Sequence, residues 1–192
     1  MKVLIDNGHG AETAGKRSPD GRLREFSYTR LIARKIEEAL RNKGIECERI
    51  VPEEEDVSLP ERCNRVNKYG SDGVLLVSIH CNAAGNGDKW LNARGWEAWT
   101  SVGNTRADQL ATCLYEAADK AGMKLRRDTS DGDPDKEGHL YILKHTACPA
   151  VLTENLFQDN REDVEYLLSD EGKEAIVSLH VNGIVEYIEN NG

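Results

Sequence analysis

The sequence has too little positive charge for a nucleic-acid binder: 25 Lys and Arg stand against 34 Asp and Glu, and the formal net charge is −9. Proteins that hold a phosphate backbone normally present a basic face, so we expect no nucleic-acid partner. No apolar run approaches the roughly 20 residues that cross a bilayer, so we expect no membrane insertion. Residues 3–5 are too short for the hydrophobic region of a secretory signal, so we expect no signal peptide in this chain.

Cysteine is also sparse, and its five copies show no Cys-x-x-Cys spacing. An odd, scattered set predicts free and mostly buried thiols rather than a disulfide framework or a zinc knuckle. No repeat, linker or change of composition divides the chain, and 192 residues suit one domain with a full-sized core. We therefore expect one domain over residues 1–192, without a separate wall-binding domain, and a monomer.

Short apolar segments alternate with helical patterns along the chain. Six segments have the composition of strands: residues 2–6, 45–51, 73–80, 95–101, 139–143 and 149–155. Helical spacing or capping residues mark helices over residues 28–44, 58–70 and 105–121, and two more after residues 160 and 170. This order predicts the α/β class, with an open, mostly parallel twisted sheet of about six strands and helices on both faces.

Three of the predicted strands run into an ionisable residue: His9, His80 and Glu154. In open α/β sheets the active crevice lies outside the carboxyl ends of the strands. Each residue alone has an ordinary explanation, because a histidine at a strand end is often structural and Glu154 would serve as a helix cap. Together they predict a site that binds a metal or moves protons.

A catalytic zinc normally has three protein ligands, and two histidines with one glutamate form an established set. The missing carboxylate should come from a loop or helix start near His9, where Glu12 and Glu25 are the candidates. Glu25 heads the first predicted helix, whose packing would direct it at the strand ends. Glu12 lies in a glycine-rich loop and is more typical of a solvated charge. We therefore favour Glu25.

His9 stands between two glycines, Gly8 and Gly10. We expect these glycines to let the backbone turn sharply off the strand and present the imidazole to the metal. A metal-bound histidine usually donates its other ring nitrogen to a second partner, for which Asp6 or a nearby carbonyl is suitable.

Five blocks of the sequence, in this order, carry a resemblance: VLIDNGHG…GRLRE, DVSLPERCNRVN, GVLLVSIHCNA, GWEAWTS and PAVLTENLFQDN. From about Val3 to Tyr187 the chain resembles the zinc-dependent N-acetylmuramoyl-L-alanine amidases of the amidase-3 family, which comprises bacterial cell-wall hydrolases and phage endolysins. The resemblance implies one Zn²⁺ per chain, with the ligands His9, Glu25 and His80, and a catalytic glutamate at Glu154. It also implies substrate-binding positions at Asn82 and Arg127, and we expect Asn155, where the chain departs from the family, to contribute to substrate binding at the pocket wall.

The resemblance further implies hydrolysis of the amide between the lactyl group of N-acetylmuramic acid and L-alanine. The substrate would be peptidoglycan or a muramoyl-peptide at the cell wall, as for an autolysin or an endolysin. Periplasmic or extracellular action, a removed leader, endolysin-type release and a cytoplasmic pool all stay open. Asn7 stands where the family has proline, and Asn155 with Leu156 replaces a smaller pair, which affects the expected substrate preference.

Three other functions are compatible with parts of the pattern. A zinc carboxypeptidase acting on wall peptides would need an arginine for a terminal carboxylate, and Arg127 is the plausible candidate. A non-catalytic peptidoglycan-binding module would tend to lose a ligand or the base, whereas all four positions are filled here. A structural α/β domain with incidental histidines would contain no zinc.

Overall fold

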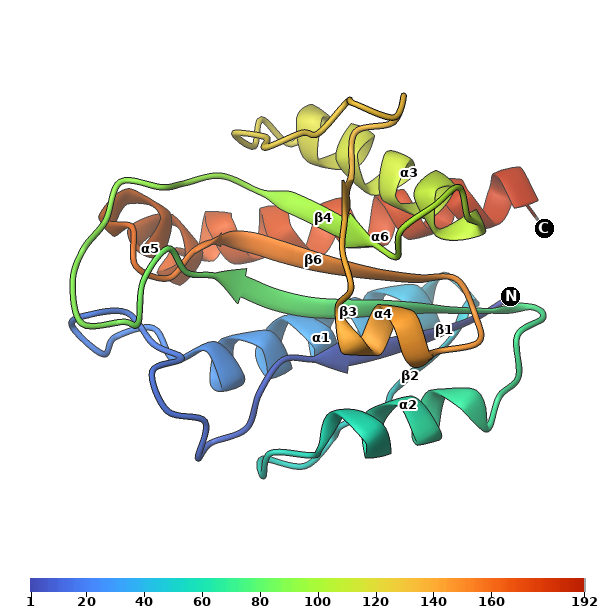
Figure 1. Ribbon diagram of the computed structural model, residues 1–192, viewed down its shortest axis with the longest axis horizontal. Helices are drawn as coiled ribbons and strands as arrows, with labels where there is room; N and C mark the ends of the chain where they lie inside the picture. The colour runs from blue at the N-terminus through green and yellow to red at the C-terminus, as the bar shows by residue number, and fades with distance from the viewer. Residues whose placement is uncertain (192) are drawn as a thin grey trace.

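The computed structural model describes residues 1–191, and its strands form a single sheet (Figure 1). The strands are β1 (Lys2–Asn7), β2 (Glu46–Arg49), β3 (Val74–Asn82), β4 (Glu97–Thr100), β5 (Lys136–Glu137) and β6 (Ala150–Phe157). The helices are α1 (Glu25–Asn42), α2 (Leu59–Asn67), α3 (Arg106–Lys120), α4 (Tyr141–His145), α5 (Arg161–Leu168) and α6 (Asp170–Asn191).

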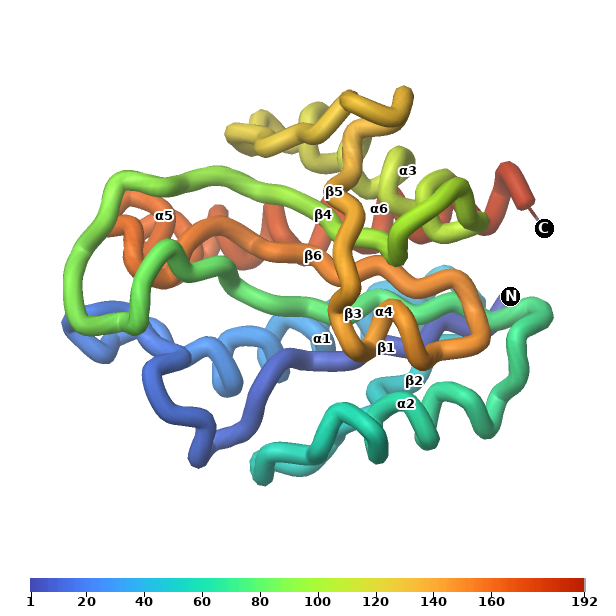
Figure 2. Tube along the Cα trace, in the orientation of Figure 1, coloured from blue at the N-terminus to red at the C-terminus, as the bar shows by residue number. Residues whose placement is uncertain are grey.

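The sheet has the strand order β2-β1-β3-β6-β4-β5. Strands β2, β1, β3 and β6 run parallel, whereas β4 runs antiparallel to β6 and pairs with β5. The chain trace in Figure 2 places β3 and β6 at the centre, side by side. The predicted open, mostly parallel α/β sheet is confirmed.

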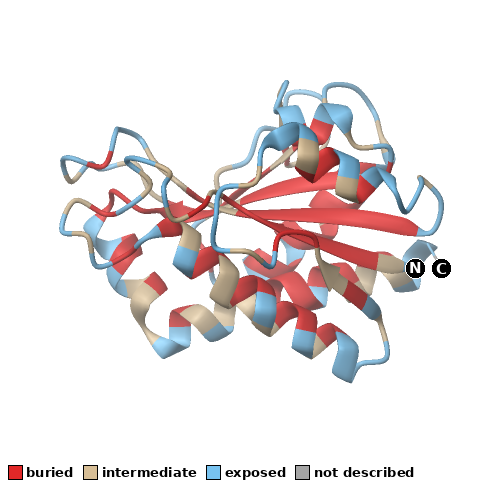
Figure 3. Ribbon diagram, turned by 90° about the horizontal axis from the view of Figure 1, so that it is seen from below, coloured by how far each residue is buried: buried red, intermediate tan, exposed pale blue. Residues whose placement is uncertain are grey.

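Alternate residues of the central strands enter two separate cores. Leu75, Val77 and Ile79 of β3 pack with α1, α3, α5 and α6 on one face of the sheet. Val74 and Leu76 pack with α2 and α4 on the other face. Figure 3 shows the strands buried between these layers. A strand that is covered on both faces needs the nearly continuous aliphatic sequence found here.

Residues 139–143, expected to form a strand, contribute instead to the short helix α4. Ile142 and Leu143 are adjacent and pack into the same core, whereas adjacent residues of a strand face opposite sides of the sheet. Lys144 N donates to Leu140 O over 3.0 Å, as in a helical turn. The strand that the sheet has in this part of the chain is β5, at residues 136–137. A short apolar run does not distinguish a buried strand from a buried helix turn by its periodicity, so this prediction was wrong.

The structure also bears on two expectations from composition, one about the cysteines and one about membrane-spanning segments. All five cysteines are free and buried, which confirms that prediction. Within residues 1–191, none of the helices has the length and apolar character to cross a bilayer.

His180 of α6 is fully buried behind β6. Its Nδ1–H donates to Ile176 O over 2.7 Å, which leaves Nε2 to accept from Thr153 Oγ1 at 2.9 Å. Burial lowers the pKa of His180 to about 4. The residue therefore folds as a neutral imidazole that fixes the strand position immediately before Glu154.

This burial predicts a loss of stability in acid. The pKa of an unfolded histidine is about 6.5, so between this value and the folded value the unfolded chain binds more protons. Stability falls as the pH falls, and His180 accounts for about 2 kcal/mol of the loss between pH 7 and pH 5. In His180→Gln, denaturant unfolding with a chelator present should show a correspondingly smaller loss between these pH values. His145→Gln, at an exposed position, is the control; equal pH dependence in all three proteins would contradict the prediction.

Candidate active site

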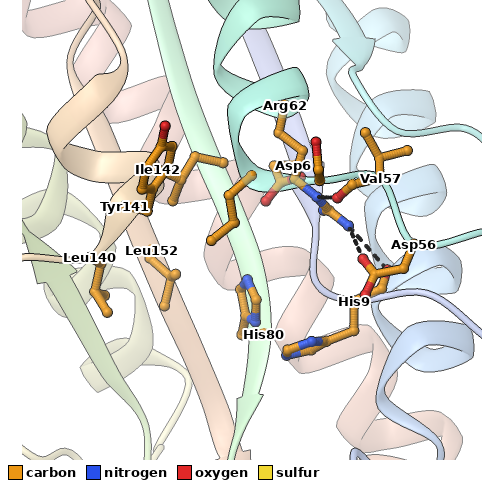
Figure 4. Close-up of a pocket in the computed structure, with 12 residues that line it drawn as sticks. Asp6, His9, Asp56, Val57, Arg62, His80, Leu140, Tyr141, Ile142 and Leu152 are labelled. Carbon is orange, nitrogen blue, oxygen red and sulfur yellow. Dashed lines mark hydrogen bonds and ion pairs between the residues drawn. The ribbon is translucent and has the colours of Figure 1, made fainter. Parts of the chain in front are cut away.

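Three side chains from separate elements converge beside the carboxyl end of the sheet. His9 follows β1, Glu25 is the first residue of α1, and His80 lies in β3. Glu25 Oε1 is 3.5 Å from His9 Nε2 and 3.2 Å from His80 Nδ1. One potential ligand atom from each side chain lies within 4.8 Å of the other two. Figure 4 shows the two imidazoles at one end of a pocket.

The donor set fits a zinc ion. Two imidazole nitrogens and one carboxylate oxygen are a known catalytic zinc set that leaves a position for water or substrate. Burial lowers the pKa of His9 to about 4, so its ring is neutral at pH 7, as a metal ligand must be. Burial opposes ionisation of Glu25, but the two imidazoles and the Cys81 amide outweigh it and lower the pKa of the carboxyl.

The glycines beside His9 have a different role from the expected one, which was to make the sharp turn of the backbone. His9 itself has a φ of 61°, so the histidine makes the left-handed turn. A Cβ at Gly8 would overlap the His80 ring, and a Cβ at Gly10 would overlap the backbone of Asp56. The glycines therefore allow close approach: one brings the two imidazoles together, and the other lets the loop pack against Asp56.

Arg62 of α2 holds this loop in place from the buried side. Its Nη1 donates to Asp6 Oδ1 over 2.6 Å and to Asn7 O over 2.7 Å, and its Nη2 donates to His9 O over 3.2 Å. The Asp6 carboxylate also accepts from Ser78 Oγ. Asp6 thus pairs with Arg62. Contrary to the expectation, its carboxylate forms no hydrogen bond to the His9 ring within residues 1–191.

The two candidate carboxylates have different surroundings. Glu25 is fully buried; its Oε1 accepts from Cys81 N at 3.0 Å and its Oε2 from Gln158 Nε2 at 3.2 Å. Glu12 instead accepts from the backbone of Asp56 at 3.3 Å and is not part of the cluster. The geometry favours Glu25 as the third ligand.

Glu154 lies next to His80 in the sheet, because β6 and β3 pair in parallel with His80 opposite Glu154. Both strands continue past these residues, to Phe157 and Asn82, so the expectation that they close their strands was wrong. Burial raises the pKa of Glu154 to about 8, and its Oε2 has no hydrogen-bond partner among the described residues. A carboxyl in this state is suited to exchanging protons near neutral pH.

The structure gives Asn155 a supporting role inside the sheet. Its side chain is fully buried; Oδ1 accepts from Trp96 Nε1 at 2.9 Å, and Nδ2 donates to His80 O over 2.9 Å. Asn155 therefore supports the backbone of His80, and it is not among the residues that line the pocket in Figure 4.

Another buried carboxylate, Glu97 of β4, lies opposite Glu154 and had no signal in the sequence. Its Oε1 accepts from Asn82 Nδ2 at 2.9 Å, and its Oε2 accepts from Arg126 Nε at 2.6 Å. Lys136 Nζ lies 3.2 Å from Oε2. Asn82 is thereby connected to β4, at the position that pairs with Glu154 of β6.

Arg127 points elsewhere. Its guanidinium pairs with Asp119 of α3 at 3.2 Å, whereas the neighbouring Arg126 reaches Glu97. The arginine one position earlier than the expected one therefore pairs with the carboxylate opposite Glu154.

The pocket in Figure 4 has a volume of about 560 Å³ and lies between the start of α2 and α4. His9 and His80 stand at its end, with side chains 21% and 17% exposed. Its apolar wall is formed by Val57, Leu59, Leu140, Tyr141, Ile142 and Leu152. A substrate with apolar groups would thus reach the two imidazoles along a defined channel.

Comparison with known proteins gives one consistent family. Residues 3–186 match the model of the Amidase_3 family, described as N-acetylmuramoyl-L-alanine amidase. The chain is 29% identical to the endolysin of Bacillus phage SPP1, over 97% of this chain and 65% of that protein. It is 31% identical to the N-acetylmuramoyl-L-alanine amidase CwlM of Bacillus licheniformis, over 96% of this chain and 67% of that protein. It therefore spans about two thirds of the length of these curated relatives.

Solved structures agree with this comparison. The N-acetylmuramoyl-L-alanine amidase from Clostridium difficile 630 superimposes with a TM-score of 0.87 at 25% identity, covering 100% of this chain and 98% of that chain. The catalytic domain of CwlV from Bacillus (Paenibacillus) polymyxa var. colistinus gives a TM-score of 0.84 at 22% identity, covering 98% and 99%. The second likeness concerns the fold alone.

The buried ion pair under the His9 loop leads to a prediction about stability. Arg62→Met would leave Asp6, which is 1% exposed, as an uncompensated buried charge, at a cost of about 3–5 kcal/mol in the free energy of unfolding. Arg65→Met on the same helix removes pairs with Glu53 and Glu61 near the surface and should cost about 1 kcal/mol or less. Urea denaturation measures both values. Equal losses would contradict the anchoring role of Arg62.

Proposed function

Because the chain belongs to the Amidase_3 family of N-acetylmuramoyl-L-alanine amidases, we propose that it is a zinc-dependent enzyme of peptidoglycan hydrolysis. The bond cleaved is the amide between the lactyl group of N-acetylmuramic acid and L-alanine of the stem peptide. The observation that supports this most is the convergence of His9, Glu25 and His80 beside Glu154. We propose residues 1–192 as one monomeric catalytic domain that acts at the cell wall.

His9, Glu25 and His80 would hold one Zn²⁺. When bound there, zinc would polarise the scissile carbonyl and lower the pKa of a water molecule. The buried Glu25 carboxylate would supply the negative charge of the set. The pKa of His9 is lowered by burial, whereas at His80 the Glu25 carboxylate outweighs burial and raises the pKa, so a protonated His80 ring would lose its proton when zinc binds there.

Glu154 supplies the proton transfers. Its carboxylate takes a proton from the attacking water and then gives it to the nitrogen of the leaving amine, which an amide needs in order to depart. A pKa raised to about 8 by burial keeps both protonation states accessible near neutral pH. Asn155 and Trp96 hold the adjacent backbone, so the carboxyl stays opposite His80.

A carboxypeptidase is the competing enzyme class. It would need a free arginine for the terminal carboxylate of its substrate, and Arg127 is paired with Asp119. Mass spectrometry of digested peptidoglycan separates the two reactions. We expect intact stem peptides with a free L-alanine amino group; release of single amino acids would favour the carboxypeptidase.

The proposed proton transfer predicts a specific effect of Glu154→Gln. Glutamine preserves the shape but takes no proton at neutral pH, so turnover should fall by about 10²–10⁴-fold while the fold and zinc content persist. Turnover of purified peptidoglycan by the zinc-loaded proteins measures this, with circular dichroism and metal analysis as controls. Parent-like turnover would remove Glu154 from the mechanism.

The proposed ligand set predicts a contrast between two glutamates. Glu25→Ala should lose most of the bound zinc, because it removes the carboxylate between the imidazoles, whereas Glu12→Ala should retain it. Chelation should abolish activity and added zinc should restore it. Metal analysis of the dialysed proteins provides the measurement, and the reverse pattern would show that Glu12 is the ligand.

A further inference from the structure

We infer that Gln158 is a positioning residue for the metal centre: its side-chain amide holds the Glu25 carboxylate with one oxygen directed at the two imidazoles. The inference rests on the proposed function, because it assigns a role in zinc binding. It concerns a side chain that does not itself belong to the three-residue cluster.

The two oxygens of Glu25 have separate partners. Oε1 faces the imidazoles of His9 and His80 and accepts from Cys81 N at 3.0 Å. Oε2 accepts from Gln158 Nε2 at 3.2 Å. A carboxylate held at one oxygen alone is able to rotate about its terminal bond. The second hydrogen bond opposes that rotation.

Gln158 is itself firmly placed. It follows directly after β6, and its backbone N–H donates to Asn82 O at the end of β3 over 2.7 Å. The side chain is fully buried. The orientation of Glu25 is thus tied to the two central strands that carry His80 and Glu154.

Packing alone does not explain an amide at this position. The Gln158 carbonyl oxygen is buried and has no hydrogen-bond partner within residues 1–191. Burying such an atom without a partner destabilises the fold, and an apolar residue of similar length would avoid that loss. What the amide provides and an apolar residue does not is a donor for the hydrogen bond to Glu25. Of the two donors to this carboxylate, Cys81 contributes through its backbone, so Gln158 is the one that a substitution is able to remove.

The test compares zinc affinity with stability in Gln158→Met. Methionine has a similar length and no donor, so the dissociation constant for Zn²⁺, measured by competition with a chromogenic chelator, should rise by about 10–100-fold. The melting temperature of the metal-free protein should stay equal to that of the parent or increase. A purely structural glutamine would give the opposite result: a lower melting temperature and an unchanged dissociation constant.

Two further variants keep the test decisive. Gln158→Leu also lacks the donor, so it should raise the dissociation constant for Zn²⁺ by a similar factor. It provides the measurement where Gln158→Met does not fold. Val164→Ala, on the buried face of α5, should lower the melting temperature and leave the dissociation constant unchanged. Parent-like zinc affinity in either folded Gln158 variant would overturn the inference. A parent protein that binds no zinc would overturn the proposed function itself, and the inference with it.

Discussion

A fully buried carboxylate is the constraint on which the rest of the site depends. Glu25 opens α1 with no exposed surface, and an isolated charge in such a place is strongly unfavourable. Its compensation comes from every neighbouring element: an imidazole after β1, an imidazole and a backbone N–H from β3, and an amide after β6. The start of α1 is therefore fixed to the two central strands. The same groups that make burial of Glu25 tolerable also assemble a donor set suited to zinc.

The polar end of the sheet is ordered by two further buried carboxylates. Asp6 is neutralised by Arg62. Arg62 also donates to the carbonyl oxygens of Asn7 and His9, and these hydrogen bonds stabilise the left-handed backbone of His9. Glu97 is neutralised by Arg126 and Lys136 on the far side of β6. Between these two compensated charges, Glu154 has no cation in contact and keeps a raised pKa. Because no cation holds Glu154 in its ionised form, as one does for Asp6 and Glu97, Glu154 is suited to proton transfer.

The sequence allowed the fold class and the cluster of candidate residues to be predicted because both depend on patterns of residue type. Aliphatic strands alternate with helices, and His9, His80 and Glu154 stand where apolar segments end, a place where buried strands rarely carry an ionisable residue. Tertiary contacts decided the rest. Tyr141–His145 forms a helix, where a strand was expected over residues 139–143, because two adjacent apolar side chains face the same core. Arg62 and Gln158 resemble ordinary polar residues of a helix face and a strand end, and only the assembled fold shows their partners.

The central claim is that His9, Glu25 and His80 form one zinc site in the arrangement they have here. Crystals grown with zinc, measured on both sides of its absorption edge, would locate the metal directly by anomalous scattering. We expect the strongest anomalous peak about 2.0–2.2 Å from His9 Nε2, Glu25 Oε1 and His80 Nδ1, with Glu154 beside it. A strongest peak elsewhere, with these three atoms free of metal, would contradict the claim.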